Sequence, residues 1–128
     1  MKDITLSTIN QFTKLEIIAF VKEKLLAQNT QSIKYFGTSA RCLYRGPNGL
    51  KCAVGHLIAD DEYGAFMEAC TINSSCFDKF EISRDRRWLL KRLQDIHDSR
   101  DPGHWIKDFA VVEADYIWME KNEKEAKS

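Results

Sequence analysis

The sequence lacks any long apolar run. Its apolar stretches are only a few residues long, as in Leu15 to Val21, where Glu16 interrupts, whereas a membrane-spanning helix needs about 20 consecutive apolar residues. The first five residues place an acid directly after the first base, and they lack the apolar core and small-residue cleavage site of a secretory signal. We therefore expect a cytoplasmic protein without a membrane partner.

Net charge is also missing, since 19 Lys and Arg residues are balanced by 19 Asp and Glu residues. No overall field draws the molecule to nucleic acid or to an anionic membrane, so bulk nucleic-acid binding is disfavoured. Apolar residues make up 44% of the 128 residues and charged residues 30%, which is typical of a globular chain with one core. We expect a single domain over residues 1–128, with a flexible charged tail over residues 121–128.

Closely spaced cysteine pairs are absent. Structural zinc sites use pairs two to four residues apart, and Cys42, Cys52, Cys70 and Cys76 are spaced more widely. We therefore expect no metal site and no cofactor. Because the chain shows no export signal, all four should be reduced thiols, and Cys42 and Cys52 suit small core positions.

Catalytic signatures are absent as well. The sequence has no nucleophile elbow, no glycine-rich phosphate loop and no paired-carboxylate motif of recognised spacing. No residue is assigned a catalytic role, and we favour a protein that is not an enzyme. The alternative is a small hydrolase or transferase that uses His97 and a cysteine; Cys52 with His97 or His104 is one such pairing.

Capping and periodicity predict four helices. The first runs from Thr8 or Thr13 to about residue 28, and the others lie over residues 60–69 and 83–97 and from residue 101 onwards. The first opens on a capping box of Thr13 and Glu16, and the last on Asp101 followed by Pro102, a strong helix start. Apolar residues on the last helix recur at alternating steps of four and three, which predicts one buried stripe. The stripe comprises Trp105, Phe109, Val112, Tyr116 and Met119.

The sharpest local signal is the turn sequence Gly46-Pro47-Asn48-Gly49 between two strand-like segments, residues 41–45 and 50–54. It predicts a β-hairpin in which Gly49 adopts the left-handed conformation. The expected register sets Tyr44 opposite Cys52 and Cys42 opposite Val54.

The remaining segments carry weaker signals. Residues 29–40 have no sustained period and are interpreted as a connection with a brief element around residues 33–36. Residues 70–82 are expected to be mostly loop. The expected fold is therefore α+β and mainly helical, with about four helices packed around one β-hairpin.

Three segments carry distinctive motifs. The longest reads Cys42-Leu-Tyr44-Arg45-Gly46-Pro-Asn-Gly49-Leu50-Lys51-Cys52-Ala53-Val54-Gly55-His56-Leu57-Ile58, and the others are Leu25-Leu26-Ala27-Gln28-Asn29 with Ser32, and Leu93-Gln94-Asp-Ile-His97-Asp98 with Pro102 and Trp105. In these motifs the chain resembles a family of small proteins encoded by tailed bacteriophages and prophages, over most of its length apart from residues 64–87. The resemblance implies a viral protein in the host-cell cytoplasm and supplies no chemistry.

Polar residues gather at the predicted junction of the last two helices, where His97, Asp98, His104 and Trp105 lie close in sequence. One interpretation is a ligand pocket in which the helix start attracts an anion and Trp105 stacks on a flat group. The other, which we favour, is structural. Asp101 then caps the last helix, His97 ends the preceding one, and Trp105 belongs to the core.

Basic residues form two further clusters. Arg41, Arg45 and Lys51 flank the predicted turn, and five more lie on the third predicted helix: Arg84, Arg86, Arg87, Lys91 and Arg92. Such runs are usually a solvated face, but if they converged they would form an anion-recognition surface.

These features favour a phage-encoded accessory protein that acts by binding. The partner is either a host protein, in host takeover or in inhibition of host defence, or a small anionic ligand that the protein sequesters. The candidate binding residues are Arg41, Arg45, Lys51, His56, His97, Asp98, His104 and Trp105.

Overall fold

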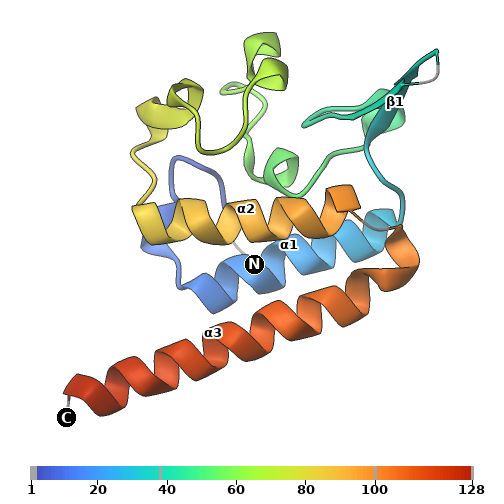
Figure 1. Cartoon of the computed structure of the whole chain (residues 1–128). Helices are drawn as coiled ribbons and strands as arrows, with labels where there is room; N and C mark the ends of the chain where they lie inside the picture. Colours follow the sequence, from blue (N-terminus) through green and yellow to red (C-terminus); the bar gives the residue numbers. More distant parts are fainter. Residues whose placement is uncertain (1–2, 38, 100, 128) are drawn as a thin grey trace.

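The computed structural model describes residues 3–37, 39–99 and 101–127 (Figure 1). Its helices are α1 (Lys14–Gln28), α2 (Arg84–Ser99) and α3 (Trp105–Lys127), its strands are β1 (Ile33–Phe36) and β2 (Ser39–Cys42), and short 3-10 helices lie between them. The three α-helices pack on one another, and the hairpin and residues 43–82 lie on one side of them. The prediction of a mainly helical α+β fold with one β-hairpin is confirmed.

The predicted start of α1 is confirmed in detail. The Thr13 hydroxyl accepts a hydrogen bond from the Glu16 amide at 3.1 Å, and the Glu16 carboxylate accepts one from the Thr13 amide at 2.9 Å. The helix ends at Gln28. The amide of the capping residue Asn29 still bonds the Leu25 carbonyl, and the left-handed backbone of Asn29 (φ 48°) then turns the chain out of the helix. None of the helices in the described part of the chain is long and apolar enough to cross a membrane.

α2 also begins where expected, whereas α3 begins at Trp105, three residues after Pro102, the predicted first helical residue. α2 starts directly after Ser83, and the Asp101 carboxylate accepts a hydrogen bond from the Gly103 amide in the short 3-10 turn that precedes α3. The inner stripe of α3 (Trp105, Phe109, Val112 and Tyr116) is buried, as predicted. Met119 is 40% exposed, so the stripe ends one turn earlier than expected. Residues 121–127 continue the helix, and the flexibility of this segment stays a prediction.

The β-hairpin lies one segment earlier than predicted. β1 pairs antiparallel with β2, with Ile33 opposite Cys42, so Cys42 pairs with residue 33 rather than with Val54. Of the expected pairing across the Gly46–Gly49 turn, the described residues retain one isolated bridge, Arg45 to Lys51, which has the predicted register.

The expected second strand is interrupted by close packing at Gly55. Val54 begins a 3-10 helix (Val54–Leu57), and a Cβ atom on Gly55 would stand 2.1 Å from the Tyr44 carbonyl oxygen. The chain therefore turns into the core directly after Cys52. Because Cys52, Ala53 and Val54 are all buried, the alternation of a half-exposed strand is lost.

The turn itself has the predicted backbone, since Gly49 has a φ of 76°. Gly49→Val should therefore lower the free energy of unfolding by about 1–2 kcal/mol, because a β-branched residue is strained at positive φ. Open space surrounds the position, so the backbone and not a clash causes the loss. An unchanged thermal midpoint would contradict this assignment.

The segment after the turn is less helical than expected. Gly64 is extended (φ −135°, ψ 140°), and the helix predicted over residues 60–69 is reduced to a turn and a 3-10 helix, Ala65–Ala69. The Glu68 carboxylate accepts hydrogen bonds from the amides of Tyr44 at 2.9 Å and Arg45 at 3.1 Å, which holds this segment against the end of β2. The loop expected next contains a further 3-10 helix, Ser75–Phe80.

Two of the four cysteines, which we expected to be reduced, are oxidised. Cys70 and Cys76 form a disulfide, and the free cysteines are Cys42 and Cys52. The intervening residues form a turn that brings the two Cα atoms within 6.5 Å. The sequence spacing of six does not specify this turn, so the prediction of four reduced thiols was wrong.

Candidate functional site

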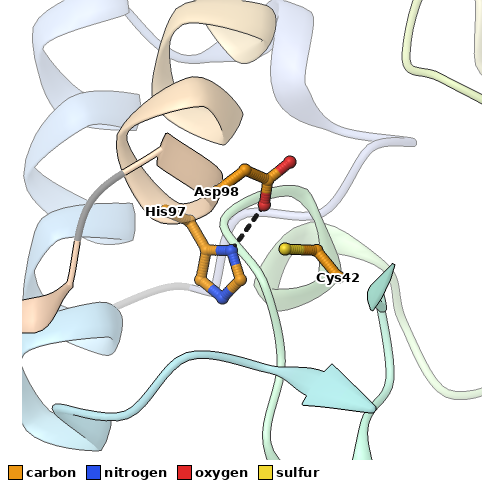
Figure 2. Close-up of side chains that lie close together, drawn as sticks. All are labelled: Cys42, His97 and Asp98. Carbon is orange, nitrogen blue, oxygen red and sulfur yellow. Dashed lines mark hydrogen bonds and ion pairs between the residues drawn. The ribbon is translucent and has the colours of Figure 1, made fainter. Parts of the chain in front are cut away.

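The end of β2 and the end of α2 bring together Cys42, His97 and Asp98 (Figure 2). One side-chain atom of each of these residues lies within 4.8 Å of the other two. The group, called here the Cys42 cluster, contains the residue types of both a catalytic cysteine–histidine pair and a metal site. The positions of the protons decide between these roles and a purely structural one.

His97 is fully buried, and both of its ring nitrogens are engaged. Nε2 lies 2.9 Å from the Ser32 backbone nitrogen, and because that N–H can only donate, Nε2 must accept. The proton of the neutral ring is therefore on Nδ1, which donates to Asp98 Oδ1 at 2.7 Å. The ring also stacks on Trp105, with centroids 5.7 Å apart.

The Cys42 thiol forms a hydrogen bond with the Asp98 carboxylate. Burial, the nearby charge of Asp98 and a hydrogen bond to its carboxylate raise the pKa of Cys42 to about 12. Burial opposes ionisation of Asp98, but hydrogen bonds from His97, Cys42 and Gln94 hold the pKa of Asp98 below its usual value. At neutral pH the cluster thus contains a thiol and a carboxylate.

This arrangement disfavours catalysis by Cys42. A nucleophilic cysteine needs a thiolate and a base that can take its proton. Here the thiol is protonated, and the lone pair of His97 faces Ser32 rather than the sulfur. Burial raises the pKa of the other free thiol, Cys52, as well. The structure therefore brings His97 and a cysteine together, as the hydrolase or transferase alternative requires, but it supplies neither a thiolate nor a base that faces the sulfur.

The same proton count disfavours a metal ion. A metal bound to His97 would replace the proton on Nδ1, and the neutral ring would then carry its proton on Nε2. Nε2 and the Ser32 backbone nitrogen, 2.9 Å apart, would then both carry a proton, and neither could accept a hydrogen bond from the other. The expectation of no metal site stays a prediction, with this geometry in its favour.

A pocket of about 290 Å³ lies beside the cluster, lined by Cys42 and Asp98 among others. Its charged lining residues are Glu68, Asp95, Asp98 and Lys91, and Lys91 pairs with Asp95 at 3.1 Å. The excess of carboxylates makes this pocket unsuited to the anionic ligand that we expected.

Of the predicted site residues at the helix junction, Asp98 lines the pocket described above, whereas His97 and Trp105 are closed off from solvent. His97 and Trp105 are fully buried and stack on each other, so neither offers a surface to a ligand. His104 is about half exposed, with Nε2 3.9 Å from the Asp101 carboxylate. The structural interpretation of this junction accounts for these contacts.

Most of the basic residues hold the fold together. Arg41 donates to the Glu68 carbonyl at 2.9 Å, and Arg45 donates to the Ile58 carbonyl at 2.9 Å and pairs with Asp60 at 2.7 Å. On α2, each of three arginines has a protein partner: Arg86 bonds the Phe12 carbonyl, Arg87 bonds the Ile72 and Ser74 carbonyls, and Arg92 pairs with Asp115. These contacts disfavour an anion-recognition surface built from these arginines.

Two predicted residues do meet. Lys51 and His56 line a second cavity, where α1 adds Lys24. Lys24 was not among the predicted binding residues, because nothing in the local sequence places α1 beside residues 51–56.

The outer face of α3 was also missed. Val111 and Trp118 there are more than half exposed. Ile106 and Ile117 are exposed as well, but they lie about 100° round the helix, on the side of α1, where Ile117 lines a cavity with Leu15 and Ala19. A signal was present, because Lys107, Val111, Ala114, Trp118 and Lys121 follow one another at steps of four and three. This outer stripe has the same period as the inner one, so α3 is apolar on two opposite faces.

Comparison of the chain with protein-family models, with curated proteins and with solved structures gives no match. The resemblance to phage proteins therefore stays a prediction. A function must be inferred from the cavities and surfaces of the molecule itself.

Proposed function

We propose that the protein acts by binding a partner protein, and that a helix of the partner packs along the outer stripe of α3. The observation that carries this proposal is the exposure of Val111 (56%) and Trp118 (65%), with the exposed Ala114 between them, on one face of α3. Single exposed apolar residues are common, but a contiguous apolar face usually marks an interaction site. Trp is also among the residues that contribute most to binding at interfaces.

The spacing of the stripe suits a helical partner. Val111 and Trp118 are seven residues apart, and the small, exposed Ala114 lies between them. Heptad spacing allows two helices to stay in contact over several turns, and a small residue lets their backbones approach. An amphipathic helix is therefore the segment that fits this face best.

The charges at the ends of the stripe indicate an acidic partner. Lys107 and Lys121 are exposed and form no ion pair with any described residue. A second copy of the chain fits poorly: antiparallel packing centred on Ala114 sets Lys107 opposite Lys121, and parallel packing sets each lysine opposite itself. A partner helix with acidic residues about two heptads apart would pair with both lysines.

The partner is then a protein whose amphipathic helix carries acids at the ends of its apolar stripe. If the phage resemblance holds, it is a host protein, which agrees with a role in host takeover or in inhibition of host defence. Sequestration of an anion is not needed for this role.

Two synthetic peptides test the proposal. Both form an amphipathic helix of about three heptads with leucine at the apolar positions, and they differ only in having Glu or Lys at the ends of the stripe. Calorimetric titration should show the Glu peptide binding about tenfold more tightly, because each end forms an ion pair beside an apolar contact.

Two variants complete the test. Trp118→Glu should abolish binding of the Glu peptide, while Trp88→Glu, at the similarly exposed tryptophan of α2, should leave it unchanged. Equal or absent binding of the two peptides would refute the acidic-helix partner. Self-association of the free protein that Trp118→Glu removes would instead show that a second copy covers the face.

A further inference from the structure

The second cavity, of about 330 Å³, lies between α1, residues 51–60 and the N-terminal residues 3–5. Lys24, Lys51 and His56 contribute its basic groups, and Asp3 and Asp60 its acidic ones. The cavity is independent of the outer stripe of α3, because the two surfaces share no residue.

The positive charges of this cavity are less well neutralised than the negative ones. Neither Lys24 nor Lys51 forms an ion pair with a described residue, and Lys24 Nζ lies 5.4 Å from the centre of the Phe20 ring. Asp60 already pairs with Arg45 at 2.7 Å. Asp3 is the remaining acid, and it is exposed.

The protonation state of His56 follows from its neighbour Gln28. The Gln28 amide nitrogen donates to the Thr30 and Lys51 carbonyls, which fixes Oε1 as the acceptor, and Oε1 also takes the Lys51 amide at 3.0 Å. His56 Nε2, 3.1 Å from that oxygen, must therefore donate. Nδ1 is left as the nitrogen that can take up a proton.

The surroundings oppose that second proton. Burial, and then the charges of Lys51 and Lys24 with a smaller contribution from His97, lower the pKa of His56 to about 4. The lysine charges thus add to the larger effect of burial, and a bound anion would oppose the contribution of the lysines.

We propose that this cavity binds a tetrahedral oxyanion, either free phosphate or the phosphoryl group of a small metabolite, between Lys24, Lys51 and His56. The two lysine ammonium groups supply the charge, and a bound anion makes protonation of the neighbouring His56 ring easier. The cavity is large enough for a phosphoryl group with a small organic substituent.

The pKa of His56 tests the proposal, because sulfate would not change this pKa if the two lysines and His56 had only a structural role. Sulfate is the probe, because it stays doubly charged across the titration, and chloride at matched ionic strength is the reference. NMR titration of the His56 ring should show its pKa rising by about one unit or more in sulfate. Lys24→Gln combined with Lys51→Gln should abolish that rise, while Lys79→Gln, at an exposed lysine that does not line the cavity, should leave it intact.

A His56 pKa that is the same in sulfate and chloride, or that rises equally without the two lysines, would overturn the site. To decide between free phosphate and a phosphorylated metabolite, the affinities of the protein for inorganic phosphate and for a nucleoside monophosphate are compared at pH 7. Tighter binding of the nucleotide by about tenfold or more assigns a phosphorylated metabolite, and equal binding assigns free phosphate.

Discussion

Replacing His97 with alanine is expected to lower the free energy of unfolding by about 3–5 kcal/mol, one of the two largest effects among our predictions. The change leaves the buried Ser32 amide without an acceptor and Asp98 without its imidazole partner. It also opens a cavity beside the fully buried Trp105. Loss of a purely catalytic group would leave stability nearly unchanged.

Chemical denaturation followed by circular dichroism measures this loss, and His104→Ala is the matched control. His104 is about half exposed and 3.9 Å from its carboxylate neighbour, so its replacement should cost less than about 0.5 kcal/mol. If both variants unfold at the same denaturant concentration as the parent, His97 does not have the structural role derived above.

Phe109→Ala should cost about 3–5 kcal/mol, because Phe109 is fully buried in the inner stripe of α3 and its removal leaves a cavity. Glu113 lies on the same helix, is one-third exposed and pairs with Lys22 at 2.8 Å. Its replacement by alanine should cost less than about 1 kcal/mol. Equal sensitivity of the two positions, measured by the same denaturation, would contradict the register of α3.

The parts of the fold that the sequence predicted correctly are those set by local contacts. The capping box of α1 and the Asp101-Pro102 signal just before the last helix act over three residues, so they are visible without tertiary structure. The inner stripe of α3 was found for the same reason, through its spacing.

The hairpin shows how a correct local signal can mislead. The turn at Gly49 has the predicted backbone, but the pairing that would extend it is lost where Gly55 packs against the Tyr44 carbonyl. Tertiary packing overrides the strand propensity of the flanking residues. β2 pairs instead with the preceding segment, β1, whose four-residue pattern is too short to predict a strand pairing from the sequence.

The candidate site depends on contacts that no local pattern contains. The cysteine that the sequence suggested as a partner of His97 was Cys52, whereas the fold brings Cys42 to the cluster from 55 positions away in the chain. The proton positions that disfavour catalysis come from Ser32, a residue with no expected role. Lys24 joins Lys51 and His56 only because α1 passes beside them.

A charge reversal at the ends of the outer stripe of α3 tests whether this stripe binds an acidic helix. In Lys107→Glu combined with Lys121→Glu, both lysines of the stripe become acids while its apolar residues remain. Calorimetric titration with the two peptides should show the preference inverted, so that the Lys peptide binds about tenfold more tightly than the Glu peptide. An unchanged preference in this variant would contradict the claim, because the end charges would then not select the partner.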